Sequence, residues 1–107
     1  MGVLKLQSIS PGDSIGNCTI SQGITGLNSS YKTMDVNIVA RQQTVQLSVT
    51  GDGNNIFTQS YTGGNNWNPQ IYTVDIAGYN SISIKLTGYC TENASQYFWI
   101  GETVIYP

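Results

Sequence analysis

Three features of the sequence predict an all-β fold, an antiparallel β-sandwich with about eight strands. Apolar and polar residues alternate along much of the chain, whereas the i, i+3, i+4 spacing of an amphipathic helix is missing. Turn-forming residues interrupt these runs roughly every eight to twelve residues. The length of 107 residues suits one domain with one core. We therefore expect a single sandwich over residues 1–107, with a jelly roll as the first choice and an immunoglobulin-like sandwich as the second.

The first half of the chain contains strand-like runs at residues 3–9, 18–22, 34–40 and 44–50. The run at 34–40 is the clearest, because every second residue from Met34 to Ala40 is apolar. A turn of sequence Gly51-Asp52-Gly53-Asn54 follows the run at 44–50. Gly and Asn tolerate the positive φ angles of a tight hairpin, so this turn predicts that the next strand pairs back on the previous one.

The second half supplies further runs at residues 55–61, 70–76, 81–88 and 97–106. A polar loop, Thr-Gly-Gly-Asn-Asn-Trp-Asn-Pro, occupies 62–69, and an Asp-x-x-Gly corner begins at Asp75. In the last run, Phe98 and Ile100 share one face while Tyr97 and Trp99 share the other. If this strand is central, Trp99 is expected in the core.

The charge pattern argues against nucleic-acid and membrane-surface functions. Only 9% of the residues are charged, the net charge is −2, and the basic residues are scattered singly at Lys5, Lys32, Arg41 and Lys85. No basic patch is present to attract phosphates or anionic lipid. No apolar run is long enough to span a bilayer, and the start of this chain is not expected to be a signal peptide. The richness in Thr, Ser, Asn, Gly and Tyr is typical of an extracellular module or a virion component.

Two cysteines, Cys18 and Cys90, allow one disulfide at most. They are either a bonded pair or two separate buried thiols, since free cysteine is often buried. With two thiols and no histidine, a zinc site is not expected.

The sequence does not predict an enzyme. It has no histidine, so the usual general base and the Ser-His and Cys-His pairs are missing. A pair of carboxylates could serve glycoside hydrolysis. However, turn, corner and outward strand positions explain the carboxylates better than catalysis does. The six carboxylates are Asp13, Asp35, Asp52, Asp75, Glu92 and Glu102.

A structural calcium ion is a weaker expectation. Jelly-roll domains can hold Ca²⁺ in loops through backbone carbonyls and one or two carboxylates. Asp52 and Asn54 are the weak candidates for such a site, although the spacing of a calcium-binding loop is missing. No other cofactor is expected.

The polar loop at 62–69 is the candidate ligand site. Sugars present flat C–H faces that stack on aromatic rings, and their hydroxyl groups need amide or carboxylate partners. The predicted contacts are Trp67, supported by Tyr61, Asn65, Asn66 and Tyr89. The structural alternative is that Trp67 folds back over an open edge of the core. Tyr79 and Tyr89 lie at strand ends, where they are expected to form the rim of a site.

The second half of the chain resembles the NPCBM-like group of galactose-binding-like β-sandwiches. The resemblance rests on Val-Thr-Gly-Asp-Gly-Asn-Asn-Ile-Phe at 49–57, on the run 74–88, and on the closing strand with Trp99. It covers residues 45–106 and implies a jelly roll. The family carries an Asp-containing segment before its late Trp, whereas this chain has Ala-Ser-Gln-Tyr-Phe at 94–98.

These observations predict a non-catalytic carbohydrate-binding module that recognises a poly- or oligosaccharide. The alternative is a structural or interaction domain of a phage or virion, such as a tail, baseplate or capsid-decoration domain. Such a domain would form a homo-oligomer or dock on a larger assembly.

Overall fold

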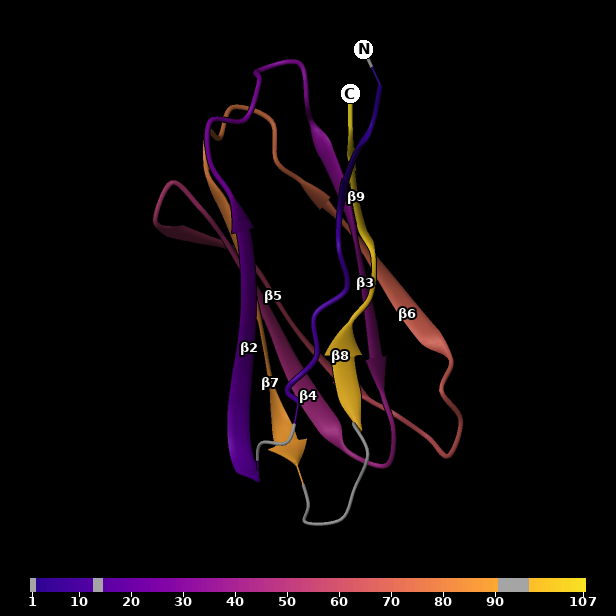
Figure 1. Ribbon diagram of the computed structural model, residues 1–107. Helices are drawn as coiled ribbons and strands as arrows, with labels where there is room; N and C mark the ends of the chain where they lie inside the picture. The colour runs from indigo at the N-terminus through magenta and orange to yellow at the C-terminus, as the bar shows by residue number, and fades with distance from the viewer. Residues whose placement is uncertain (1, 13–14, 91–96) are drawn as a thin grey trace.

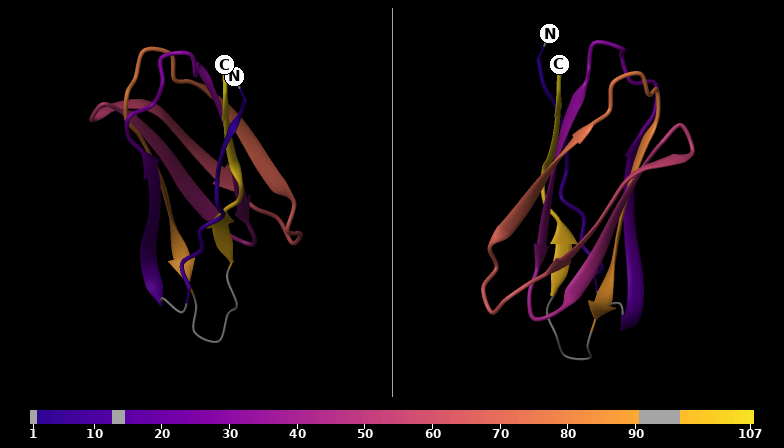
Figure 2. Two further views of the ribbon diagram at one scale, coloured as in Figure 1. Left: turned by 45° about the horizontal axis from the view of Figure 1, so that its top comes forward. Right: turned by 180° about the vertical axis from the view of Figure 1, so that it is seen from behind.

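The computed structural model describes residues 2–12, 15–90 and 97–107, and in these ranges the chain forms two antiparallel sheets that face each other (Figures 1 and 2). Sheet A has the strand order β1 (Leu4–Leu6), β9 (Thr103–Tyr106), β3 (Thr33–Ala40) and β6 (Pro69–Asp75), and β8 (Phe98–Ile100) also pairs with β3. Sheet B has the order β2 (Gly16–Ile24), β7 (Ile82–Cys90), β4 (Thr44–Gly51) and β5 (Asn54–Thr62). The described residues contain no helix long and apolar enough to cross a membrane.

The core lies between the two sheets and is built from the alternation seen in the sequence. Met34, Val36 and Ile38 of β3 are fully buried, as are Leu47 and Val49 of β4, which they face from the opposite sheet. Alternate residues of β7 complete this layer. The period of two therefore sorts side chains into core and surface as predicted.

Both predicted turns of the middle region are present. Asp52 and Gly53 have φ angles of 51° and 85°, as a tight hairpin with two left-handed residues requires. The corner after β6 is held by Asp75, whose Oδ1 accepts a hydrogen bond of 3.0 Å from the Ala77 N–H. Gly78 follows with φ 89°, a conformation that favours glycine.

The expected strand at 97–106 is two strands, because the pairing with β3 shifts register at Gly101. β8 pairs with the end of β3, whereas β9 pairs with the start of β3 and also with β1. The Gly101 N–H donates to the Asn37 carbonyl at 2.7 Å, and a Cβ on Gly101 would lie 3.0 Å from the Asn37 side chain. Nine strands are therefore formed by the described residues, one more than the sequence predicts.

The first two strands also differ in length from the prediction. The regular part of the first strand is only Leu4–Leu6, and Ile9 makes a separate bridge to Ile100. The second is longer, because Gly16–Ile24 pairs residue by residue with Ile82–Cys90. The glycines of β2 do not interrupt this ladder. Asp13, one of the six carboxylates named above, lies outside the described residues.

Candidate functional site

The loop that carries Trp67 is fixed to the turn between β3 and β4. The Gln42 N–H donates to the Gly64 carbonyl at 2.9 Å, and the Gly63 N–H donates to the Gln43 carbonyl at 2.8 Å. A Cβ on Gly63 would lie 2.0 Å from the Ala40 carbonyl oxygen, so only glycine permits this approach. The loop therefore lies directly against the β3–β4 turn.

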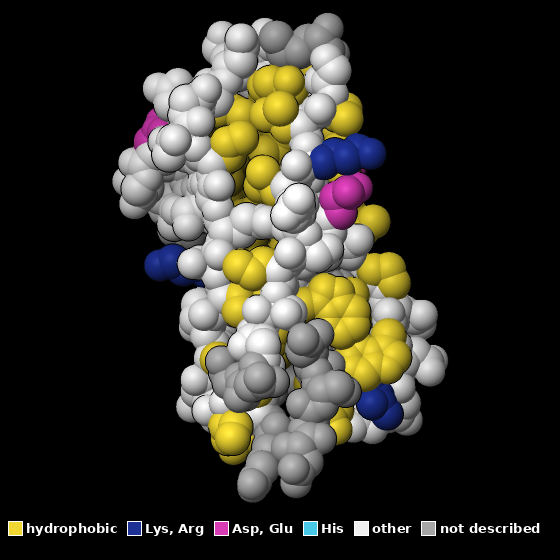
Figure 3. Space-filling view, in the orientation of Figure 1, with side chains coloured by type: hydrophobic (Ala, Val, Ile, Leu, Met, Phe, Trp, Pro, Cys, Tyr) yellow, Lys and Arg dark blue, Asp and Glu magenta, His cyan; other side chains and the backbone are white. Residues whose placement is uncertain are grey.

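Three aromatic rings stack at this end of the sandwich, and we call Trp67, Tyr97 and Trp99 the aromatic platform. The ring centroids of Trp67 and Trp99 are 5.2 Å apart at an interplanar angle of 26°. Those of Trp67 and Tyr97 are 6.2 Å apart at 28°. Trp67 keeps 40% of its surface exposed. In Figure 3, hydrophobic ring side chains lie flat on the lower part of the surface, over β8 and beside a basic side chain.

The position of Trp99 corrects the prediction that it is a core residue. Phe98 and Ile100 are fully buried and point between the sheets. Trp99 lies on the other face of β8, opposite Val39 of β3, and is only partly buried. On this outer face of sheet A the Trp99 ring stacks with Trp67 instead of filling the core.

Arg41 borders the platform. Its guanidinium carbon is 5.0 Å from the centroid of the Trp67 ring and 5.8 Å from that of Tyr97, distances at which a cation is attracted to an aromatic ring. The Arg41 backbone N–H donates to the Tyr97 carbonyl at 2.9 Å, and its Nε donates to the Asn65 carbonyl at 3.1 Å. Backbone and side chain together hold the guanidinium beside the rings.

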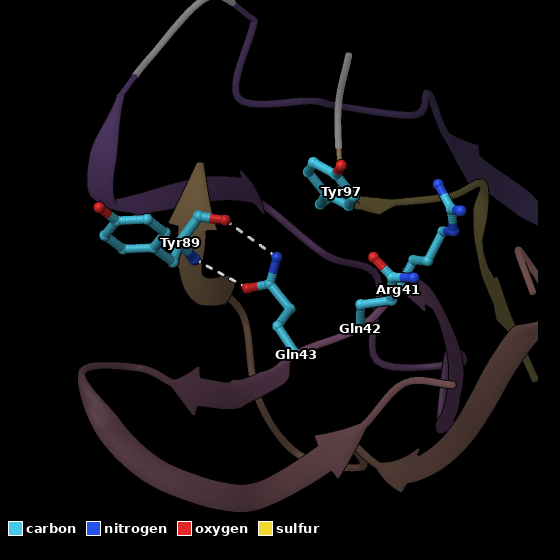
Figure 4. A pocket seen from close by; sticks show the side chains of 5 residues that line it. All are labelled: Arg41, Gln42, Gln43, Tyr89 and Tyr97. Atoms are coloured by element: carbon cyan, nitrogen blue, oxygen red, sulfur yellow. Dashed lines mark hydrogen bonds between the residues drawn. The ribbon is translucent and has the colours of Figure 1, made fainter. Parts of the chain in front are cut away.

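A cavity of about 180 Å³ adjoins the platform, and we call it the end pocket. Its lining consists of Arg41, Gln42, Gln43, Tyr89 and Tyr97 (Figure 4). The Gln43 side chain is fixed by two hydrogen bonds to the Tyr89 backbone, one accepted from its N–H at 2.8 Å and one donated to its carbonyl at 2.9 Å. The Tyr89 ring itself is 50% exposed and lies across Gln43 from Tyr97. Tyr97 and Arg41 belong to both the platform and the end pocket, so the two features are continuous.

Most of the predicted ligand contacts come together here. Trp67 and Tyr89 belong to the platform and the end pocket. Asn65 lies in the same loop, where its Oδ1 accepts from the Gln42 side chain at 3.2 Å. Asn66 is exposed next to Trp67. Tyr61 is elsewhere: it lies opposite Val45 on the inner face of sheet B and packs against the core.

Sequence reasoning missed three members of the site: Tyr97, Trp99 and Arg41. The alternation in the last strand had already put Tyr97 and Trp99 on one face. Only the pairing of β8 with β3 makes that face the outer one. Arg41 carried no signal beyond its place in a turn. Tyr79, expected at a site rim, instead covers Gly51 at the opposite end of the sandwich, where a Cβ on Gly51 would lie 2.6 Å from the ring.

The described carboxylates lie away from the platform and have other partners. Asp35 accepts hydrogen bonds from Thr73 at 2.7 Å and from Tyr106 at 3.3 Å. Desolvation raises the pKa of the Tyr106 phenol, and the nearby Asp35 carboxylate adds to this shift. Glu102 is 4.0 Å from Lys5. Glu92 lies outside the described residues.

The calcium site at Asp52 and Asn54 stays a prediction. One oxygen of the Asp52 carboxylate accepts hydrogen bonds from the N–H groups of Asn80 at 3.1 Å and Ser81 at 2.9 Å. Within the described part of the chain, no three His, Cys, Asp or Glu side chains come together as metal ligands. These two hydrogen bonds join the Asp52 carboxylate to the connection between β6 and β7.

The two cysteines lie side by side on neighbouring strands as free thiols. Their sulfur atoms are 3.0 Å apart, and Cys18 on β2 is one diagonal step from Cys90 on β7. Burial raises the pKa of the Cys90 thiol to about 11, and the hydrogen bond with Cys18 contributes to this shift. The two thiols are thus unbonded and in contact, and the disulfide stays a prediction.

Comparison with known proteins identifies the fold. No protein-family model matches the chain, and no curated protein sequence matches it. The structure is similar to the crystal structure of the CBM36-1 domain of a multidomain xylanase from the hindgut metagenome of Trinervitermes trinervoides. The TM-score is 0.55 at 14% identity, over 99% of this chain and 98% of that domain. This chain folds as an antiparallel jelly-roll sandwich.

A CBM36 carbohydrate-binding module solved in complex with calcium and xylotriose gives a TM-score of 0.49 at 12% identity, over 97% of this jelly roll and 98% of that chain. The predicted antiparallel jelly-roll sandwich is confirmed by the architecture and by the likeness to the xylanase domain.

Proposed function

We propose that this jelly roll is a non-catalytic carbohydrate-binding module that holds a poly- or oligosaccharide on the aromatic platform and in the end pocket. The observation that carries the proposal is the Trp67 ring, which rests on Trp99 and Tyr97 and still keeps 40% of its surface exposed. A rigid, partly open aromatic surface beside a pocket with polar groups is the usual make-up of a small-molecule site.

The geometry suits a sugar for two reasons. Because neighbouring rings hold Trp67 in place, stacking a pyranose on it costs little side-chain entropy. The amides of Gln42 and Asn66 lie around the platform and the end pocket and can pair with the hydroxyl groups of the sugar. One sugar unit would stack on the platform, and the next would reach the end pocket toward Tyr89.

The comparison supports this proposal at the level of fold, because the similar xylanase domain is a CBM36 module. A fold alone does not determine a ligand, so the argument rests on the platform. The carboxylates of the described residues that have partners lie away from the rings, which favours binding over hydrolysis. Membership of the NPCBM-like group and an extracellular location are part of the same proposal.

The test is binding to a glycan array, followed by native affinity electrophoresis with the polysaccharides that bind. We expect Trp67→Ala to weaken binding at least about tenfold, since stacking on an aromatic ring supplies much of the energy. Trp67→Phe should keep part of the affinity. Val3→Ala, which trims another exposed apolar residue on the N-terminal segment before β1, is the control and should bind like the wild type.

Stability measurements separate binding from folding. The stacked pairs of Trp67 are worth about 1 kcal/mol, so Trp67→Ala should lower the melting temperature by only a few degrees and stay folded at the assay temperature. Undiminished glycan binding by folded Trp67→Ala would contradict the proposal. Light scattering after size exclusion tests the rival, because a stable oligomer that binds no glycan would favour a virion or assembly domain.

A further inference from the structure

Arg41 adds a charge to a site that otherwise consists of rings and amides. Its guanidinium lies over both Trp67 and Tyr97, and the hydrogen bond from Nε to the Asn65 carbonyl fixes its plane. Among the described residues this is the hydrogen bond that the Arg41 side chain makes, so its two terminal nitrogens can donate to a ligand. A guanidinium held in this way is pre-organised, because its rotamer is already set before binding.

The same guanidinium has no described counter-ion. The ion pair found among the described residues joins Lys5 of β1 to Glu102, which precedes β9, at 4.0 Å. No described carboxylate lies within that distance of Arg41. The chain as a whole carries a net charge of −2, so a polyanion is not drawn to it by overall charge. Any preference for an anionic ligand must then come from this local group.

We propose that the platform selects acidic polysaccharides and that Arg41 pairs with the carboxylate of a uronic acid unit. This inference rests on the carbohydrate-binding function proposed above and names its substrate class. The flat face of the sugar ring would stack on Trp67, and the planar carboxylate of that unit or of its neighbour would meet the planar guanidinium edge. Arginine and carboxylate form paired, charge-assisted hydrogen bonds that are stronger than neutral ones.

The experiment compares each acidic polymer with its own carboxyl-reduced form, which has the same backbone with an alcohol in place of the acid. Polygalacturonate, alginate and glucuronoxylan serve as the probes, and affinity electrophoresis or calorimetry gives the affinities. For the polymer that binds, we expect the acidic form to bind about tenfold more tightly than the reduced form at low salt. The difference should shrink in about 0.5 M NaCl, where surface charges are screened.

Two variants of Arg41 and one matched control assign the effect. Arg41→Gln should remove the preference, so that acidic and reduced forms bind this variant alike, and Arg41→Lys should keep only part of it because a lysine has no planar fork. Lys85→Gln removes the same charge from the exposed face of β7 and should bind as the wild type does. Thermal unfolding of each variant shows that the comparison is made on folded protein.

The outcomes separate this inference from the proposed function. If the wild type binds neutral and acidic forms equally, or if Arg41→Gln keeps the preference, the acidic class is wrong while carbohydrate binding stands. If sulfated dextran binds as tightly as the uronic acid polymers, the selection is for negative charge in general and the carboxylate assignment is overturned. If no glycan of either kind binds, both the inference and the proposed function fail.

Discussion

The loops at the two ends of the sandwich contain similar residues, but their side chains make different contacts. At the hairpin end, the turn at Gly51–Asn54 meets the connection between β6 and β7. The Tyr79 ring lies directly on Gly51, and the Asp52 carboxylate takes up the N–H groups of Asn80 and Ser81. At this end the ring and the carboxylate therefore contact other parts of the same chain and stabilise the fold.

At the platform end, the rings stack on one another instead of on the backbone. Trp67 remains 40% exposed, and Arg41 is fixed by its Nε while its terminal nitrogens make no hydrogen bond with the other described residues. Glycine, asparagine and an aromatic residue occur in the loops at both ends, so composition does not tell them apart. What distinguishes a binding loop here is the surface on which its aromatic ring packs.

The largest expected effect is that of a Cys18–Cys90 disulfide on the free energy of unfolding. At the hairpin end, hydrogen bonds of Asp52 connect the β4–β5 turn to the β6–β7 connection. Near the platform end, two unbonded thiols of β2 and β7 lie 3.0 Å apart. Oxidation by a disulfide such as oxidised glutathione would remove one proton and one electron from each thiol and form the Cys18–Cys90 bond. We expect the unfolding free energy to rise by about 4 kcal/mol in the chain-entropy model for a long loop.

Denaturation with and without reductant measures this difference, and the mass change confirms the bond. The Cys90 pKa of about 11 keeps that thiol protonated at neutral pH, so we expect oxidation to speed up as the pH rises toward that value. Cys18→Ser is the control and should show no effect of oxidant. Equal stability of the oxidised and reduced protein would show that the bond distorts the pairing of β2 with β7 and so cancels the expected gain.

The second effect tests the fixed loop of the platform end. Gly63→Ala places a methyl group 2.0 Å from the Ala40 carbonyl oxygen, and the backbone must shift to admit it. We expect a loss of about 3 kcal/mol in unfolding free energy together with weaker glycan binding, because Trp67 lies in the displaced loop. Gly64→Ala is a matched control, since nothing lies within 4 Å of its Cβ position. A Gly63→Ala protein as stable as Gly64→Ala would contradict the close packing of this loop.

The third effect belongs to the hairpin end. Asp52→Ala removes the acceptor of two backbone hydrogen bonds and puts alanine at φ 51°, so we expect a loss of about 2 kcal/mol. Asp52→Asn keeps an acceptor oxygen and tolerates this φ, and it should cost much less. Glycan binding should be unchanged in both variants, as measured on the array. If a folded Asp52 variant lost glycan binding, the ligand would bind at the hairpin end and not at the platform end.

Much of the fold could be predicted because it depends on local patterns. The period of two in β3 and β4, the Gly51–Asn54 turn and the Asp75 corner each specify their own structure. The break at Gly101 could not be predicted, because it arises where the pairing with β3 shifts register between β8 and β9. Strand partners are a property of the whole chain, whereas alternation is a property of a few residues.

The site was predicted in part for the same reason. Trp67 in a polar loop was a local signal, and so was Tyr89 at a strand end. Tyr61 also lies at a strand end beside the polar loop, yet its pairing with Val45 turns its side chain toward the core. Trp99 was expected in the core and lies in the platform, because β8 turns Phe98 and Ile100 inward and Trp99 to the outer face of sheet A. Arg41 becomes a site residue only through its position over two rings from distant parts of the chain.

The smallest expected effect separates two neighbouring amides of the platform end. The Asn65 side chain accepts a hydrogen bond from Gln42 at 3.2 Å, whereas Asn66 is exposed and makes no side-chain hydrogen bond with the described residues. Asn65→Ala should therefore cost about 0.5 kcal/mol in unfolding free energy.

Asn66→Ala, by contrast, should leave the stability unchanged and lower the glycan affinity a few-fold, because its amide is free to pair with a sugar hydroxyl. Chemical denaturation and affinity electrophoresis on both variants give the two readouts. If Asn66→Ala destabilises the protein without changing the affinity, this amide stabilises the fold and does not contact the sugar. The polar side chains of the platform end would then have the same structural role as those of the hairpin end.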